Sequence, residues 1–409
     1  MVTAMLLAAF LLTPFGAFFL LLMIYKKPSL RHKYASFVGL LFGMMGYCTR
    51  PVRTIDISRY FEQIDGIREL PFSQAAGWMD DGLIVKNVFF WLIAKIGDNQ
   101  LLPFFSLLII YGITTYVLAD ALEDDDKKLF GNILLLQILQ IPFYTVFSNV
   151  RNVVAFAFLL LAVYRDLYRQ KRDIITLVLY IVPCYIHLTG FVIVIVRFSV
   201  PIIKRMSYLG TAMTFAVPTS VVALYPRLRS ISLPGNIGKV ISRAIWKAYA
   251  SVIRTSDYAQ EVQTHGSFVA NRALAAVFCV LLMYLIIQYQ DIYRSENRYK
   301  YEYSLYVEIM TIISFMLTAI GVVKYWVFMY MVYISCSPIL IEFAHKQEGK
   351  KKKAYYCYIF IWIVMGLRFV LQLRSMYKNL DIAWFMERIL FTNYPMVVFQ
   401  IIKGIATMH

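Results

Sequence analysis

Hydrophobic residues in this sequence are gathered into long runs, and short clusters of charged residues separate one run from the next. Most runs are about 17 to 25 residues long, which is the length that an α-helix needs to cross the hydrocarbon core of a membrane. The pattern therefore predicts an all-α polytopic integral membrane protein with roughly 12–14 transmembrane helices. Spans are expected at about 4–25, 34–49, 101–120, 129–148, 152–165, 174–188, 190–204, 208–225, 269–289, 303–321, 323–343, 354–373 and 387–404.

Two segments depart from this pattern. Residues 83–97, "LIVKNVFFWLIAKIG", are too few and too charged for a span, so we expect a re-entrant or interfacial segment. The first apolar run has no basic region before it and no small-residue cleavage site, so we expect a helix that is kept rather than a signal peptide. No repeat of fixed period and no soluble domain is visible, and we take residues 1–409 as one transmembrane domain.

Composition agrees with a membrane protein. The chain is 60% hydrophobic and 16% charged, whereas a soluble protein carries roughly a quarter charged residues. The net charge of +17 does not indicate a nucleic-acid partner, because basic residues gather on the cytoplasmic loops of membrane proteins. The five cysteines form no Cys-x-x-Cys pair, so neither a disulfide framework nor a zinc site is indicated.

The short basic clusters orient the helices. "KKPSLRHK", "RDLYRQKR", "KRMS", "YRSENRYK" and "HKQEGKKKK" all fall on one side, the cytoplasmic one, if 83–97 does not cross the membrane. The N-terminus then lies outside, and the acidic "EDDDKK" lies inside, slightly against the usual bias. The segments expected on the outer face are the loop 50–82, the turns 148–152 and 188–190, the loop 226–268 and the segment 374–386.

The loop 50–82 contains "TIDISRYFEQI", which predicts an amphipathic helix. Its polar face would carry Asp56, Arg59, Tyr60 and Gln63. Its apolar face would carry Ile57, Phe61 and Ile64, and Arg50 and Arg53 precede it. Two interpretations remain open: a substrate-binding face, or an interfacial helix whose arginines contact lipid phosphates and whose Asp56 pairs with Arg59.

Two further polar elements are expected on the outer face. In "FSNVRNVVAFAF", Arg151 stands between Asn149 and Asn152 in a very short turn. A guanidinium presents a planar fork of donors that suits phosphate, although an ordinary turn with an arginine that reaches lipid is the alternative. In "YIHLTGF", His187 ends a span and Thr189 follows. This histidine is either a proton-transfer group or a structural residue at a helix end.

The three elements, in this order, resemble those of the EpsG-like branch of the Wzy-type polysaccharide polymerases. That family has a D-x-x-x-Y element, an N-x-R-Q turn before an alanine-bearing helix, and an H-x-[ST] element. The matching residues are Asp56 with Tyr60, Asn149 with Arg151 and Ala155, and His187 with Thr189. The family's glutamine is Asn152 here, and the resemblance covers about residues 35–200.

The resemblance implies a metal-independent membrane glycosyltransferase with a GT-C-like helical bundle and amphipathic loop helices on its outer face. It would move a glycan chain from undecaprenyl diphosphate to the next undecaprenyl-diphosphate-linked repeat unit of an O-antigen, capsule or exopolysaccharide. The location implied is the bacterial cytoplasmic (inner) membrane, with the active site outward. The partners implied are the lipid-linked oligosaccharides, the lipid bilayer, and a chain-length regulator and a flippase of the same pathway.

This reaction needs charge neutralisation at the leaving diphosphate and a base for the acceptor hydroxyl. With no acidic metal-binding cluster on the outer face, we expect no cofactor and no metal, and we assign the neutralisation to arginines. Arg151 is the first candidate, supported by Arg59, Arg53 and Arg50. Asp56 and His187 are both candidates for the base. We expect Tyr60, Asn149, Asn152 and Thr189 to contact substrate.

The loop 226–268 is basic although it is expected outside. "LPGNIGKVISRAIWKAYASVIR" predicts an interfacial amphipathic helix whose Arg243 and Lys247 would bind diphosphate or anionic glycan, or only lipid headgroups. Arg272 in "VANRALAA" again stands at an outer helix start and is a candidate for a second diphosphate site.

Two other functions remain open at this point. An O-antigen-ligase-like glycosyltransferase would use outer-face arginines on the same donor but a different acceptor. A transporter or flippase for lipid-linked oligosaccharides would place ionisable groups near the midplane and would often have two related halves. The polar residues of this chain instead gather towards one face.

Overall fold

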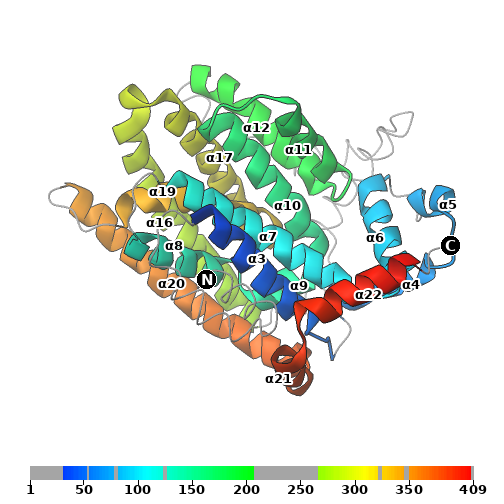
Figure 1. The fold of residues 1–409 in the computed structure, drawn as a ribbon. Coiled ribbons are helices and arrows are strands. Elements are labelled where there is room, and N and C mark those ends of the chain that lie inside the picture. The colour runs from blue at the N-terminus through cyan, green and yellow to red at the C-terminus, as the bar shows by residue number, and fades with distance from the viewer. Residues whose placement is uncertain are drawn as a thin grey trace, which may run out of the picture. The chain divides into compact units, whose positions relative to one another are not determined.

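The structure, a computed structural model, describes residues 31–52, 55–77, 82–122, 127–206, 266–320, 325–344 and 350–406. Within these ranges it is helical and contains no strand, only one isolated antiparallel bridge between Pro51 and Leu380 (Figure 1). The chain forms two compact units. The first is Met1–Leu134, Pro142–Ala157 and Gln372–His409, and the second is Leu135–Ile141 and Phe158–Leu371.

The helices follow the apolar runs, and α8, α10 and α20 each have residues in both units. Those of the first unit are α3 (Arg31–Tyr47), α4 (Asp56–Gly66), α5 (Phe72–Ala76), α6 (Ile84–Ile96), α7 (Leu101–Ala121), α9 (Phe143–Ser148), α21 (Ile382–Phe391) and α22 (Tyr394–Ala406). Those of the second unit are the π-helix η3 (Tyr164–Tyr168), α11 (Ile174–Cys184), α12 (Thr189–Met206), α16 (Gly266–Glu296), α17 (Arg298–Ile320), α18 (Tyr325–Ser335) and α19 (Ser337–Phe343). The shared helices are α8 (Lys127–Gln140), α10 (Val150–Val163) and α20 (Lys350–Asn379).

In the first unit, α3 lies directly against α7 because glycines remove the side chains between them. A Cβ on Gly39 would lie 2.7 Å from the Leu108 carbonyl oxygen, and one on Gly43 would lie 3.0 Å from that of Phe104. Small residues four apart allow the close backbone approach that stabilises helix pairs in membranes. This packing fixes the end of α3, from which the chain runs through Arg50 to α4.

In the second unit, α17 contacts α12, α16, α18 and η3. An ion cluster around a buried carboxylate holds part of this unit together: the Asp166 carboxylate lies 2.5 Å from the buried Arg197 guanidinium and 2.8 Å from that of the exposed Arg172. The Tyr180 hydroxyl donates to the same carboxylate over 3.1 Å. Arg197 is therefore paired inside the unit, as a charged side chain buried in the protein must be.

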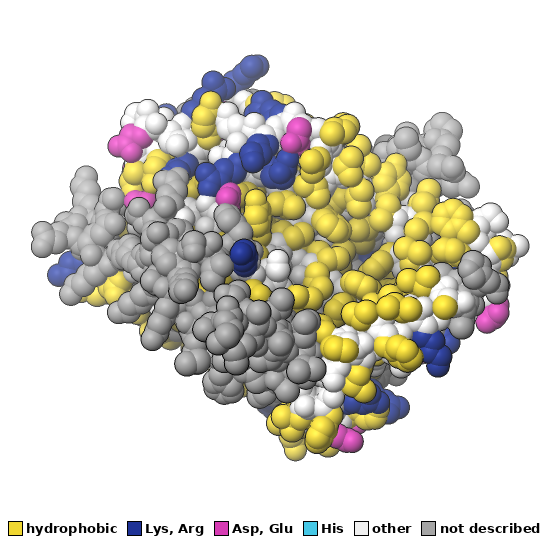
Figure 2. Space-filling view, viewed as in Figure 1, with side chains coloured by type: hydrophobic (Ala, Val, Ile, Leu, Met, Phe, Trp, Pro, Cys, Tyr) yellow, Lys and Arg dark blue, Asp and Glu magenta, His cyan; other side chains and the backbone are white. Residues whose placement is uncertain are grey.

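Apolar side chains on the helix surfaces point away from their own unit. On α20 they recur at helical spacing as Phe360, Ile363, Leu367 and Val370, each more than half exposed. Hydrophobic side chains also gather over much of the face seen in Figure 2. Stripes of this kind mark a surface that contacts lipid. The protein is therefore a helical, multi-pass membrane protein.

Three of the described helical segments are long and apolar enough to cross a membrane: Leu101–Ala121, Phe268–Glu296 and Lys352–Asn379. The count rises to five if two bent pairs each form one span, Tyr325–Ser335 with Ser337–Phe343 and Ile382–Phe391 with Tyr394–Ala406. Among the described residues, length and composition thus support three to five of the roughly 12–14 expected spans. One reason is that apolar runs are interrupted: the expected span 129–148 breaks at Pro142 into α8 and α9. The expected spans 4–25 and 208–225 lie outside the described residues.

Candidate functional site

Helix α4 forms where the amphipathic pattern predicts it, at Asp56–Gly66, and it packs against α6 and α9. Its buried residues are Ile57, Tyr60 and Ile64, which recur at i, i+3 and i+7 and so form one stripe. The assignment of Tyr60 to the polar face was therefore wrong. Its ring lies 5.8 Å from that of Phe90 on α6, because the large apolar body of a tyrosine gains more from burial than its single hydroxyl loses.

Arg151 lies over this buried tyrosine. The chain turns between α9 and α10 at Asn149, whose carbonyl oxygen accepts the first backbone hydrogen bonds of α10, from Asn152 over 3.0 Å and from Val153 over 3.2 Å. The Arg151 guanidinium carbon lies 5.4 Å from the centre of the Tyr60 ring, a cation–π contact. Burial raises the pKa of Tyr60, and the Arg151 charge opposes that rise. The N-terminus of α10 therefore combines the positive charge of Arg151 with the positive end of the helix dipole.

Asp56 and Arg59 lie close to Tyr60 and Arg151. An Arg59 guanidinium nitrogen lies 3.4 Å from the Asp56 carboxylate, and the two side chains are 65% and 46% exposed. Tyr60 experiences the charges of Asp56, Arg59 and Arg151 together, and Asp56 also acts electrostatically on Tyr144 of α9. Because the ion pair is exposed, it is weak and opens readily. The first unit thus brings together two arginines and one carboxylate from segments about ninety residues apart.

Residues near the C-terminus support this cluster through contacts with α9. The Asn379 side chain donates to the Tyr144 hydroxyl over 2.9 Å, and Thr145 donates to Gln372 over 2.9 Å. The link between α20 and α21 also pairs with the link between α3 and α4. There, the Val52 amide donates to the Asn379 carbonyl over 2.9 Å.

Arg50 is held by the same C-terminal segment. Its carbonyl oxygen accepts the Asp381 amide over 3.0 Å, and its guanidinium lies 5.4 Å from the centre of the Trp384 ring. Arg388 lies over the same ring at 4.3 Å. Three of the other residues expected to bind substrate, Arg53, Arg243 and Lys247, lie outside the described residues, as does most of the loop 226–268.

His187 belongs to the second unit, where it caps α12. The Thr189 backbone amide donates to Nδ1 of His187 over 3.2 Å. A neutral imidazole that accepts at Nδ1 carries its proton on Nε2, so at that atom it is a donor. The turn is tight as well, since a Cβ on Gly190 would lie 3.0 Å from the Pro183 carbonyl. This geometry fits a capping residue better than a base.

The last two expected residues have different surroundings. Asn152 is 6% exposed, and no described residue makes a hydrogen bond to its side-chain oxygen. Arg272 lies near the start of α16 in the second unit, within electrostatic range of Tyr325. Within the ranges that the structure describes, no group of three or more His, Cys, Asp or Glu side chains could hold a metal ion.

A family model, that of the EpsG family, matches residues 58–380 of the 409-residue chain. The match includes Arg59, Tyr60, Arg151 and His187, and it begins two residues after Asp56. Nothing among the curated proteins and nothing among the solved structures matches the chain. Because the family model covers most of the sequence, the chain belongs to the EpsG family.

Proposed function

We propose that this protein transfers a glycan chain from undecaprenyl diphosphate to the next undecaprenyl-diphosphate-linked repeat unit, on the outer face of the cytoplasmic membrane. Membership of the EpsG family indicates a polysaccharide-polymerase type of function. The finer statement is supported above all by one observation: Arg151 lies over Tyr60, beside Arg59 and Asp56.

The charges of this cluster suit a leaving diphosphate. Arg59 and Arg151 against Asp56 leave an excess of one positive charge in this part of the first unit. The Arg151 Nε is buried and has no hydrogen-bond partner among the described residues, so it retains a donor for a ligand. The start of α10 adds backbone amides and the positive end of a helix dipole, which together favour phosphate groups.

In the proposed reaction, the acceptor hydroxyl oxygen forms a bond to the anomeric carbon of the donor sugar. The bond from that carbon to the diphosphate oxygen breaks, and both of its electrons leave with the diphosphate. Arg151 and Arg59 stabilise the resulting charge. The hydroxyl proton goes to the Asp56 carboxylate, which the weak ion pair with Arg59 leaves accessible.

His187 has a positioning role in this proposal, because its Nδ1 is occupied by the Thr189 amide. We expect His187→Asn to retain most of the polymerisation rate, since asparagine caps helices through its side-chain oxygen. We expect His187→Ala to lower both thermal stability and rate. Rate and melting temperature of the purified variants provide the check. A general base would instead give an equally large loss of kcat in both variants.

The outward orientation of α4 can be tested by labelling. We expect Glu62→Cys, at an exposed position of α4, to react with a membrane-impermeant maleimide in intact cells. The five native cysteines are buried free thiols, so the unsubstituted protein provides a low background. Labelling that requires permeabilised cells would place α4 on the cytoplasmic side and contradict the proposal.

The function itself is tested by reconstitution. Purified protein in proteoliposomes, supplied with purified undecaprenyl-diphosphate repeat unit, should give a ladder of chain lengths, and a chelator should leave that ladder unchanged. Transfer of a preformed chain to a terminal acceptor, without a ladder, would indicate a ligase. Movement of the lipid-linked unit across the bilayer without any new glycosidic bond would indicate a flippase.

A further inference from the structure

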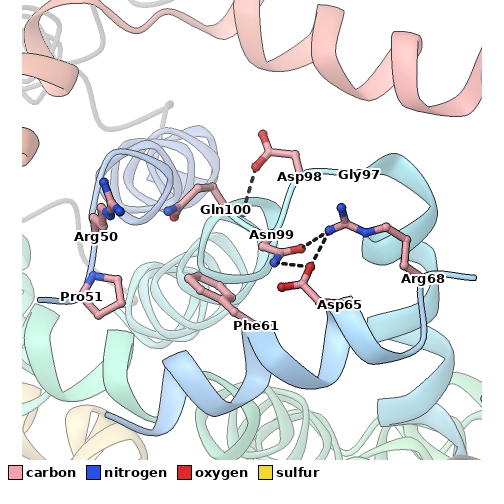
Figure 3. Close-up of a pocket in the computed structure, with 9 residues that line it drawn as sticks. All are labelled: Arg50, Pro51, Phe61, Asp65, Arg68, Gly97, Asp98, Asn99 and Gln100. Carbon is pink, nitrogen blue, oxygen red and sulfur yellow. Dashed lines mark hydrogen bonds and ion pairs between the residues drawn. The ribbon is translucent and has the colours of Figure 1, made fainter. Parts of the chain in front are cut away.

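A second polar site lies beside α4 in the first unit. A cavity of about 390 Å³ is lined by the α3–α4 link, by α4 and the turn after it, and by the turn between α6 and α7 (Figure 3). Its volume is in the range of small-ligand sites. Of its lining residues, the sequence pattern had singled out Arg50 for substrate binding.

The walls of the cavity are held in place by their own hydrogen bonds. Arg68 donates to Asp65 over 2.7 Å and to the Asn99 side-chain oxygen over 3.0 Å, and Asn99 donates back to Asp65 over 3.0 Å. The Asp98 carboxylate accepts hydrogen bonds from the Gln100 backbone amide over 3.0 Å and from the Tyr47 hydroxyl over 2.6 Å. Figure 3 shows the closed triangle of Asp65, Arg68 and Asn99. Polar groups fixed in this way are preorganised for a ligand.

Some hydrogen-bonding capacity of the cavity is unused. The Gln100 side-chain oxygen is buried and has no hydrogen-bond partner in the part of the chain that the structure describes, and the same is true of the Arg68 Nε. Such atoms are costly unless a ligand or water satisfies them. Arg50 contacts the Trp384 ring but, among the described residues, no carboxylate. A ligand here therefore meets both donors and an acceptor.

The cavity differs in net charge from the Arg151 cluster, which is the group formed by Asp56, Arg59, Tyr60 and Arg151. Arg50 and Arg68 are balanced by Asp65 and Asp98, so the formal charges sum to zero. A diphosphate would find no net attraction, whereas a neutral ligand with many hydroxyl groups could pair with carboxylate, amide and guanidinium groups. Phe61 adds an aromatic surface to the same wall. These features together select a neutral sugar ring.

Helix α4 connects the cavity to the reaction site. Phe61 and Asp65 line the cavity, while Tyr60 and Asp56 belong to the Arg151 cluster. Asp56 and Asp65 are nine residues apart, which corresponds to about 14 Å along the helix axis. We propose that this cavity is a carbohydrate subsite that binds a neutral sugar of the lipid-linked repeat unit. This assignment rests on the proposed polymerase function.

The test uses Gln100→Leu in the full chain. No other part of the described structure bonds the Gln100 side-chain oxygen, so the substitution should leave folding intact. We expect the KM for the lipid-linked repeat unit to rise about tenfold while kcat stays within about twofold, because one hydrogen bond made equally in ground and transition states is lost. Binding of the lipid-free oligosaccharide, released from that unit by mild acid, should weaken by the same factor.

Gln137→Leu is the matched control, since Gln137 is a buried glutamine whose side chain has no hydrogen-bond partner within the described ranges, and it does not line the cavity. It should leave KM and oligosaccharide binding unchanged.

Wild-type-like KM and binding in Gln100→Leu, in a protein that forms a ladder, would overturn the subsite alone. If the wild type forms no ladder but binds the oligosaccharide through Gln100, the polymerase function fails and the sugar site stands. Binding of inorganic pyrophosphate should weaken in Arg151→Ala and not in Gln100→Leu; the opposite pattern would show that the cavity is the phosphate site.

Discussion

Arg151→Ala is expected to lower the polymerisation rate by about two to three orders of magnitude, the usual effect of losing one group that stabilises a developing charge. In the proposed reaction the guanidinium over Tyr60 neutralises the leaving diphosphate, because Arg59 is 65% exposed and shared with Asp56. The loss should appear in kcat, because the leaving group gains its charge as the bond breaks. Single-turnover formation of the first ladder product measures it.

Two companion variants separate catalysis from folding. Arg151→Lys keeps the charge but loses the planar fork, so we expect an intermediate rate. Arg169→Ala is the matched control, since Arg169 makes the same type of contact with Tyr168, at 5.5 Å, in the second unit. It should leave the ladder intact at equal expression. An unchanged ladder in folded Arg151→Ala would remove Arg151 from the mechanism.

Asp166→Leu is expected to produce the largest loss of stability, about 3–5 kcal/mol, because it leaves the Arg197 guanidinium buried without its carboxylate. Both side chains are nearly inaccessible, with Arg197 5% and Asp166 6% exposed. Tyr180 also loses the acceptor of its hydroxyl. The melting temperature of the detergent-solubilised protein and its amount in the membrane provide the measurement.

The double replacement of Asp166 and Arg197 by leucine should recover much of this loss, because no unpaired charge is then buried. Arg298→Ala is the control: it breaks an ion pair of similar length, 3.0 Å to Glu302, in which the arginine is 74% exposed. Such a pair contributes less than about 1 kcal/mol. A single Asp166→Leu variant as stable as this control would mean that water reaches Arg197.

Much of the local structure was predictable because local patterns encode it. The apolar runs indicated a helical membrane protein, and the repeat of Ile57 and Ile64 placed α4 within a residue or two. The three polar elements led to the EpsG family, which the family match confirms. The number of spans was less accessible, since a run such as 129–148 contains Pro142, and hydrophobicity alone does not tell a continuous span from two shorter helices.

The sequence by itself determined which segments are helical, which are apolar enough for a membrane, and which short elements carry arginine, aspartate and histidine. Tertiary structure alone decided that Tyr60 is buried beneath Arg151, that the C-terminal segment holds Arg50, and that the turn before α7 completes a cavity with α4. The physical reason is that periodicity fixes the faces of one helix, whereas the choice of which faces meet depends on packing between residues far apart in the chain. Many apolar surfaces fit one another nearly equally well, and local sequence does not distinguish among them.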